Sequence, residues 1–422
     1  MSAAVDRYAR HRAIAGFSQD VLQASRFAVI GAGAIGNEVV KNLCLLGVGA
    51  VDVYDFDVVE RHNLTRSVLL READVGTPKA AAVARHAADL DPAVTVTAIA
   101  GDIRDTLGIA AARGYHCVIG ALDNFEARLR VNQVCWLAGV DWVNAAIDSR
   151  SVSVETFPFA APDRGTLPGR DAAALPACYE CGLPASVYGR IAERYSCGGL
   201  LRAALRERVM PTTAITASIA GAQAVDAALK LARAPVHGEP MRGEPVHGEP
   251  VHSEQVHSEP VHGEPAARRW WFDTGSGHAS GARIARNPAC PGCGDLPRRA
   301  RLVRAADARV ATIAAAASAA GATTVRFSDS LVWRCACANC GPTAATRAAL
   351  LRPARAVSEA IVQCPRCRDA TVRVEIRDVV DVDELRGAVN LVPADALLPI
   401  RFALAGDVCI EPPDQAEPRV HH

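Results

Sequence analysis

Three glycines after the first apolar run have the spacing of a phosphate-binding turn. Gly31, Gly33 and Gly36 form the pattern G-x-G-x-x-G, followed by helical spacing and by a second apolar run that ends in acids at Asp55 and Asp57. In such a turn the first glycine permits the bend, the second lets backbone approach a phosphate, and the third lets the helix pack on the strand. Free N–H groups at the helix start then face the anion. The pattern predicts a nucleotide site, and alone it also fits NAD-dependent oxidoreductases.

Eight of the fourteen cysteines form four C-x-x-C pairs. In a cytosolic chain this spacing indicates metal binding more often than disulfides. Two pairs fit one tetrahedral zinc site that joins distant segments, and the other two are typical of a zinc ribbon. A redox role is less favoured, because neither of the first two pairs opens a helix after a strand. The predicted Zn²⁺ ligands are Cys178, Cys181, Cys290 and Cys293 in one site, and Cys337, Cys340, Cys364 and Cys367 in the other.

Further polar residues follow the second apolar run at regular places. The stretch Val-Val-Glu-Arg-His-Asn-Leu-Thr-Arg contains Asn63 and Arg66, and Asp-Val-Gly-Thr-Pro-Lys ends at Lys79. Gly-Ala-Leu-Asp-Asn-Phe then contains Asp123. A dehydrogenase needs one acid about twenty residues past the glycines, which Asp55 supplies. A dehydrogenase would give no role to Arg66, Lys79 and Asp123, so hydride transfer is less favoured.

Together with Arg-Tyr-Ala-Arg-His near the start, these motifs resemble the ubiquitin-activating and ThiF/MoeB-like adenylyltransferase superfamily. The resemblance covers roughly Arg7 to Gly294. It implies ATP and Mg²⁺ as cofactors and the activation of a C-terminal carboxylate by attack on the α-phosphate. Negative charge then accumulates on phosphate oxygens, which calls for several cations and a metal ligand.

The resemblance also implies a role for each polar residue. Asp55 and Asp57 would lie at the ribose, and Asp123 would hold Mg²⁺ with the pyrophosphate. Three residues would approach the phosphates, namely Asn63, Arg66 and Lys79. Arg10 matches an arginine that homodimers of the family insert into the partner's site. The chain departs from the family at Ser67, where a glutamine is usual, and this concerns the fine geometry around the phosphates.

Cys197 is the candidate nucleophile for a second step. It lies sixteen positions after Cys181, in Arg-Tyr-Ser-Cys-Gly-Gly. In ubiquitin-activating enzymes, the catalytic cysteine lies in this crossover, attacks the acyl-adenylate and carries the modifier as a thioester, and a thiolate suits that task as a strong nucleophile. The alternative is a spare cysteine in a loop. In the sulfur-carrier branch, a cysteine here forms an acyl disulfide or has no role.

Strands and helices that would position these residues alternate along the first part of the chain. The alternation predicts an α/β fold with a doubly wound, Rossmann-like and mostly parallel sheet. We expect strands at 27–30, 50–54, 94–98, 116–120 and 141–145, and further strands at 151–157, 270–273 and 282–286. We expect helices at 7–14, 18–24, 34–46, 78–90, 105–112, 124–138 and 212–231.

We predict two domains. The first, 1–300, is the adenylation domain, with a crossover loop at 163–211 that holds the candidate nucleophile. It also contains a loop at 234–267 with six pentads of the Val-His-Gly-Glu-Pro type, whose alternating prolines favour disorder. The second, 301–422, is a small α+β zinc-ribbon domain of unknown role, in which 372–376 and 379–385 form a strand pair.

Bulk composition narrows the function classes. The formal net charge is zero and half of the 422 residues are hydrophobic, which favours neither nucleic acid nor a membrane surface. No signal-peptide pattern opens the chain, so we expect a cytoplasmic enzyme. The resemblance implies a ubiquitin-like β-grasp protein and a conjugating enzyme as partners, and a homodimer. Two alternatives stay open: adenylation of a sulfur carrier or peptide without a thioester, and a non-enzymatic nucleotide-binding scaffold.

Overall fold

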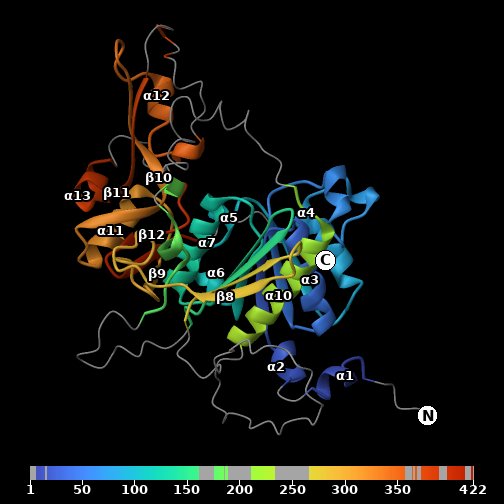
Figure 1. The fold of residues 1–422 in the computed structure, drawn as a ribbon. Helices are drawn as coiled ribbons and strands as arrows, with labels where there is room; N and C mark the ends of the chain where they lie inside the picture. The colour runs from blue at the N-terminus through green and yellow to red at the C-terminus, as the bar shows by residue number, and fades with distance from the viewer. Residues whose placement is uncertain are drawn as a thin grey trace, which may run out of the picture.

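A computed structural model describes residues 6–14, 17–160, 175–184, 186–188, 211–232, 266–356, 364, 366–367, 372–388, 397–413 and 420–421 (Figure 1). Within these ranges the strands form two sheets, one of nine strands and one of five. The larger sheet holds the segments that carry the glycine turn. The smaller sheet is formed by the last third of the chain and stands beside it.

The larger sheet has the strand order β14-β3-β2-β1-β4-β5-β6-β7-β8. Strands β3, β2, β1, β4 and β5 pair in parallel, and β6, β7, β8 and β14 pair antiparallel with their neighbours. The predicted Rossmann-like sheet is therefore confirmed. The strands are β1 (Arg26–Ile30), β2 (Ala50–Asp55), β3 (Thr95–Ala100), β4 (Cys117–Gly120), β5 (Trp142–Ile147), β6 (Ser151–Phe157), β7 (Arg268–Asp273), β8 (Ala279–Arg283) and β14 (Val420–His421).

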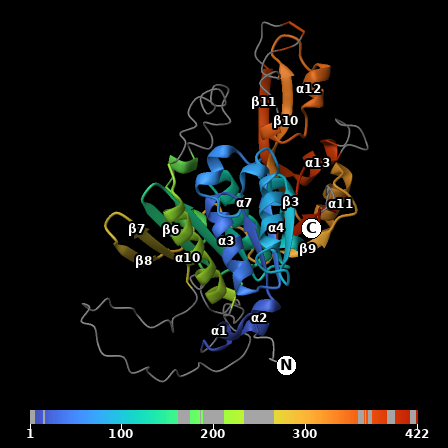
Figure 2. The ribbon, with the colours of Figure 1, turned by 90° about the vertical axis from the view of Figure 1, so that its right-hand side faces the viewer.

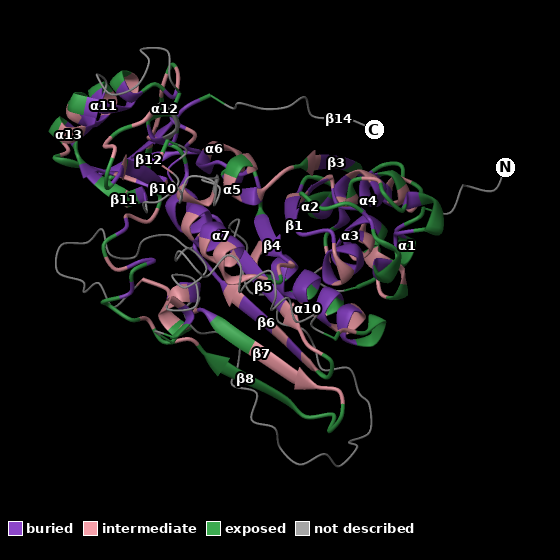
Figure 3. Ribbon diagram, turned by 90° about the horizontal axis from the view of Figure 1, so that it is seen from above, coloured by how far each residue is buried: buried purple, intermediate pink, exposed green. Residues whose placement is uncertain are grey.

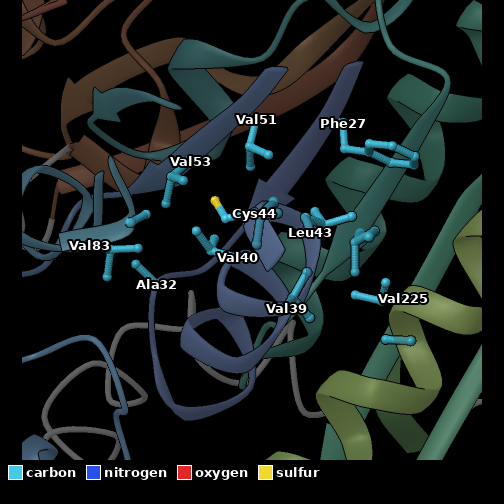
Figure 4. Close-up of a cluster of buried hydrophobic side chains, with 14 of the residues drawn as sticks. Phe27, Ala32, Val39, Val40, Leu43, Cys44, Val51, Val53, Val83 and Val225 are labelled. Carbon is cyan, nitrogen blue, oxygen red and sulfur yellow. The ribbon is translucent and has the colours of Figure 1, made fainter. Parts of the chain in front are cut away.

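Three long helices cover one face of this sheet: α3 (Ala34–Leu46), α4 (Lys79–Ala88) and α10 (Ala214–Ala232) (Figure 2). Their apolar side chains enclose a core that includes Val39 and Leu43 of α3, Val51 and Val53 of β2, and Val225 of α10 (Figure 4). The alanine-rich sequence of α10 lets it approach α3 closely. The bounds of α3 agree with those expected from the apolar spacing. Two short helices, α1 (Ala9–Arg12) and α2 (Gln19–Gln23), precede β1.

The opposite face is covered by α5 (Ile103–Thr106), α6 (Ile109–Ala112) and α7 (Phe125–Ala138). The prediction of a single helix at 105–112 was wrong, because Leu107 and Gly108 are both extended and Gly108 is the N-cap residue of the next helix. Gly108 is packed against Glu411 and Arg401 of the smaller sheet, where a Cβ would not fit. The break in the helix therefore comes from long-range packing.

The smaller sheet has the order β11-β10-β12-β13-β9, and one of its faces is covered by helices. The prediction of a strand pair at 372–376 and 379–385 was wrong. One strand runs to Asp381, and the acidic Val-Asp-Glu-Leu-Arg stretch after it is helical. The elements are β9 (Arg301–Arg304), β10 (Thr324–Cys337), β11 (Val372–Asp381), β12 (Ala403–Ala405), β13 (Val408–Glu411), α11 (Val310–Ala319), α12 (Ala344–Ala348) and α13 (Val382–Ala388).

The smaller sheet is attached through the α5–α7 layer (Figure 1). Phe402 and Leu404 belong to the same apolar cluster as Leu107 and Ile109. The fully buried carboxylate of Glu411 accepts a hydrogen bond of 3.0 Å from the backbone N–H of Ala110, in the first turn of α6. Short helices leave their first N–H groups without internal partners, so this contact satisfies one of them.

At the other end of the larger sheet, β7 and β8 are much less covered (Figure 3). All five residues of β8 are exposed. The strand expected at 282–286 begins three residues earlier than predicted, at Ala279. Among the helices that the structure describes, none combines the length and the apolar character needed to cross a bilayer.

Asp141 precedes β5 and gives a pH-dependent contribution to stability. Its buried carboxylate accepts a 2.7 Å hydrogen bond from the N–H of Ala160, and burial raises the pKa from 3.8 to about 6. The folded state therefore holds the proton more tightly, and stability falls as pH rises between these values, by on the order of 3 kcal/mol.

We expect Asp141→Asn to gain stability over the parent as pH rises through this window. Urea denaturation at several pH values measures this, and a pH-independent difference would contradict it.

Candidate functional site

The glycine turn between β1 and α3 is fixed by close backbone packing. Gly31 has φ +98°, and a Cβ there would lie 2.5 Å from the carbonyl oxygen of Ala121. A Cβ on Gly36 would overlap the carbonyl oxygen of Gly31. Gly33 differs, because a Cβ there meets nothing within 4 Å. Two glycines therefore serve the packing of the turn, and the third leaves its outer surface open to a ligand.

Asn37 is a residue of this site that the sequence analysis missed. Its fully buried amide donates to the carbonyl oxygens of Ala32 and Gly33, at 2.7 and 2.9 Å, and accepts from the N–H of Leu69 at 2.9 Å. The side chain thus connects the turn to the loop after β2. An amide within an otherwise apolar helix segment was the available signal, since a buried polar side chain requires partners.

The acids at the end of β2 lie against the glycine turn. Asp55 accepts a 2.6 Å hydrogen bond from the N–H of Ala32 and a 2.7 Å bond from the N–H of Asp57. Burial raises the pKa of Asp55 even though these N–H groups oppose the shift. Asp57 is half-exposed, and its carboxylate lies 2.7 Å from the Nζ of Lys79. Lys79 begins α4, so this ion pair joins α4 to the end of β2.

Asn63 and Arg66 belong to the loop between β2 and α4. The Asn63 side chain is buried and accepts a 2.9 Å hydrogen bond from the N–H of Glu60 in a capping box around the 3₁₀ helix η1 (Arg61–Thr65). Arg66 ends η1, and its guanidinium donates to the carbonyl oxygen of His62 at 2.7 Å on the exposed side. The amide therefore shapes the loop, and the guanidinium stays at the surface. Ser67 is buried in the same loop.

Asp123 lies in the loop between β4 and α7, on the neighbouring strand of the parallel sheet. It is exposed and accepts a 3.2 Å hydrogen bond from the side chain of Asn124. Asn124 caps α7 by accepting from the N–H of Ala127 at 2.9 Å. The loops after β1, β2 and β4 all leave from the carboxyl edge of the parallel strands, where ligands of open α/β sheets bind.

Arg10 lies apart from these loops, on α1, where it is exposed. That helix is attached to the body by Tyr8, whose hydroxyl donates to the buried carboxylate of Asp91, and by Arg7, whose Nε lies 3.1 Å from the same carboxylate. Burial raises the pKa of Tyr8 to about 12. Cys197, the candidate nucleophile, lies outside the described residues.

Both groups of four cysteines converge in space. In the first, Cys178 Sγ lies 3.6 Å from Cys290 Sγ and Cys181 Sγ lies 3.5 Å from Cys293 Sγ. The four Sγ atoms of each group lie within 4.8 Å of one another. Tetrahedral thiolate sites with Zn–S bonds of about 2.3 Å have sulfur atoms about 3.8 Å apart, so both groups fit zinc.

The second group lies at the end of the long antiparallel pair of strands β10 and β11. Cys337 ends β10 and lies 3.7 Å, Sγ to Sγ, from Cys367. Cys335 is buried beside this group but is not among its four members. The four cysteines that the sequence predicts as C-terminal zinc ligands therefore converge, whereas their metal binding and the classification as a zinc ribbon stay predictions.

The metal content tests both groups. We expect about two Zn²⁺ per chain, because each group offers a complete tetrahedral set of soft ligands. Cys181→Ser and Cys340→Ser are each expected to lose one, measured by inductively coupled plasma mass spectrometry after gel filtration. Cys335→Ser is the matched control and retains both. Loss of a metal in this control, or full content in the two ligand variants, would contradict the assignment.

Comparison with known proteins identifies the family. The model of the ThiF family matches residues 6–259, which is more than half of the chain. The chain belongs to the ThiF family. The match includes the glycine turn and the loops after β2 and β4.

Relatives within this family share the first part of the chain. The SAMP-activating enzyme E1 of Haloferax volcanii is 38% identical over 146 residues, which are 34% of this chain and 54% of the relative. The sulfur carrier protein adenylyltransferase of Thermus thermophilus is 34% identical over 166 residues, 39% of this chain and 58% of the relative. The molybdopterin-synthase adenylyltransferase of Salmonella typhimurium is 30% identical over 156 residues, 36% of this chain and 63% of the relative.

These matches therefore span between 54% and 63% of the three relatives. Among solved structures, Escherichia coli MccB with ATP is similar, with a TM-score of 0.47 and 22% identity over 69% of this chain and 75% of MccB. The family assignment comes from the sequence match.

Proposed function

We propose that this protein activates the C-terminal carboxylate of a ubiquitin-like β-grasp protein with ATP. One observation carries the proposal: a lysine, two aspartates and an open glycine turn meet at the carboxyl edge of β1 and β2, joined by the Asp55–Ala32 and Asp57–Lys79 contacts. The relatives supply the reaction class, since two are adenylyltransferases by name and a third is an E1-type activating enzyme.

In the proposed first step, a carboxylate oxygen of the modifier attacks the α-phosphorus of ATP. The bond between that phosphorus and the bridging oxygen breaks, and pyrophosphate leaves with the electron pair. Lys79 and Arg66 offset the negative charge that builds up on the phosphate oxygens. Asp55 positions the ribose side through the turn it supports, and Asp123 would ligate Mg²⁺, whose role is to neutralise the leaving pyrophosphate.

The Asp57–Lys79 ion pair fixes the position of the Lys79 ammonium group before ATP binds. The side chain of Lys79 is 13% exposed, whereas that of Asp57 is 48% exposed. A phosphate that approaches the glycine turn competes with Asp57 for the same ammonium group. Asp57 is then released toward the ribose hydroxyls, which the resemblance assigns to it.

Removal of the predicted phosphate and metal contacts should abolish the first step. We expect Lys79→Ala and Asp123→Ala each to slow ATP–pyrophosphate exchange about a hundredfold or more, the usual cost of one preorganised charge contact. Exchange is measured with β-grasp proteins that end in glycine. Lys230→Ala and Asp226→Ala are matched controls, because these residues form an exposed pair on α10. Undiminished exchange in the Lys79 and Asp123 variants would contradict the assignment.

In the proposed second step, the thiolate of Cys197 attacks the carbonyl carbon of the acyl-adenylate. A thioester forms and AMP leaves with the bonding electrons. A conjugating enzyme then accepts the modifier on its own thiol. The support is sequence position alone: this cysteine lies after the first zinc pair and before α10, as the nucleophile does in ubiquitin-activating enzymes.

The thioester has its own test. We expect ATP and the modifier to give an adduct on the parent chain that dithiothreitol removes, visible by non-reducing electrophoresis and intact mass. Cys197→Ala should lose the adduct and retain pyrophosphate exchange, and Cys335→Ala should keep both. Exchange without any adduct on the parent would favour the alternative, adenylation of a sulfur carrier or peptide without a thioester. Absence of exchange altogether would favour the nucleotide-binding scaffold.

We also propose a homodimer in which Arg10 reaches the partner's site. The support is its exposed position on α1, outside the loops of its own site. Mixed dimers of an Arg10→Ala chain and a Lys79→Ala chain should recover part of the activity, since one of the two sites is then complete.

A further inference from the structure

A cavity of about 410 Å³ lies between α7, the first cysteine group and the smaller sheet. Its walls include Leu129 and Arg130 of α7, Leu296 after the second cysteine pair, and Asp329 of β10. Small-molecule pockets span roughly 300–1,000 Å³, so the volume suffices for a small ligand. Among the described residues that line it, none belongs to the predicted nucleotide site. The cavity is therefore a second candidate binding site.

Arg130 is a buried cation in the wall of this cavity. Its side chain is only 5% exposed, and its Nη1 has no hydrogen-bond partner among the described residues. Its Nη2 donates to the carbonyl oxygen of Ser328 and lies 3.1 Å from the carboxylate of Asp329. A guanidinium remains charged, and a buried N–H group without a partner costs free energy. An anion in the cavity would interact favourably with the positive charge of this guanidinium.

The acids around the cavity have cationic or polar neighbours. Asp329 lies between two guanidinium groups, with Arg355 Nε 3.4 Å from its Oδ1 and Arg130 Nη2 3.1 Å from its Oδ2, although its Oδ2 accepts no hydrogen bond among the described residues. Glu180 accepts from the side chains of Asn132, at 3.2 Å, and Tyr188, at 2.7 Å. Glu126 is also engaged. Four arginines and three acids line the cavity, and this balance of charge favours an anionic ligand over a cationic one.

The remaining lining residues favour an organic body on that anion. Leu129, Leu296, Pro291 and Ile376 are apolar and come from three different walls. We propose that the cavity binds a small organic oxyanion, a carboxylate or a phosphate ester, whose charged end accepts from Arg130 and whose apolar part contacts these side chains. Because the walls include α7, which covers the larger sheet, and strands β10 and β11 of the smaller sheet, such a ligand also strengthens the contact between the two parts.

The test uses the full chain with zinc and without ATP. Benzoate and phenyl phosphate carry the two candidate oxyanions on the same apolar body, benzyl alcohol lacks the charge, and inorganic phosphate lacks the body. Binding is measured by isothermal titration calorimetry, and a ligand-dependent rise of the unfolding temperature is expected with it. We expect saturable binding of benzoate or phenyl phosphate, and the tighter of the two identifies the oxyanion. Benzyl alcohol and inorganic phosphate should bind at least about tenfold more weakly.

Two variants of the cavity and one control complete the test. Arg130→Gln removes the charge, and Ala354→Trp fills the space while it keeps every charged residue of the lining. Each should weaken binding about tenfold or more, whereas Arg283→Gln on the exposed strand β8 should leave it unchanged. If Arg130→Gln does not fold, the Trp variant decides alone. The proposal is overturned if neither oxyanion binds the parent, if benzyl alcohol binds equally well, or if the cavity variants bind like the control.

Discussion

Close contact between the backbones of Gly31 and Gly36 is the constraint on which the predicted nucleotide site depends. We call this site, at the carboxyl edge of β1, β2 and β4, the nucleotide edge. No side chain fits between the turn and the first turn of α3, so the helix starts directly on the end of β1. That position lets Asn37 reach back to two carbonyl oxygens of the turn and forward to the loop after β2. Asp55 completes the arrangement from the next strand. The open position at Gly33 is thereby surrounded by fixed backbone, which is the preorganisation that phosphate chemistry requires.

The first half of the fold was predictable because its signals are local. Apolar runs, the glycine turn and a capping Asn124 determine β1, α3, β4 and α7 within one or two residues. The predicted nucleotide-site residues that follow β1, β2 and β4 also come to one edge by a general rule, since parallel strands bring their carboxyl ends together, whereas Arg10 lies on α1. Asn37 was missed because its role depends on Leu69, thirty-two residues away, and no local pattern encodes that contact.

The last third of the chain was less predictable for the opposite reason. The long strand β10 pairs with β11 through two register shifts and joins β9 to the sheet only through strands that come much later. The apolar alternation in this region predicts two strands. Instead, the acidic segment after β11 forms the helix α13, which packs against α11. The cysteine spacing correctly predicted that the four cysteines converge, because a shared metal site would require this whatever the intervening topology.

The elements on either side of the pentad segment are fixed in the fold, and this affects how far the number of pentads can change. Helix α10 is packed on α3 and β7 is paired with β6, so the segment leaves from and returns to positions that the sheet already holds in place. The composition predicts a loop over residues 234–267, and for a loop whose two ends are fixed each doubling of length adds only about 0.6 kcal/mol of closure entropy. Repeats can therefore be gained or lost at this point with little effect on folding. A change in the number of pentads is therefore expected to leave both the larger sheet and the geometry of the nucleotide edge unchanged.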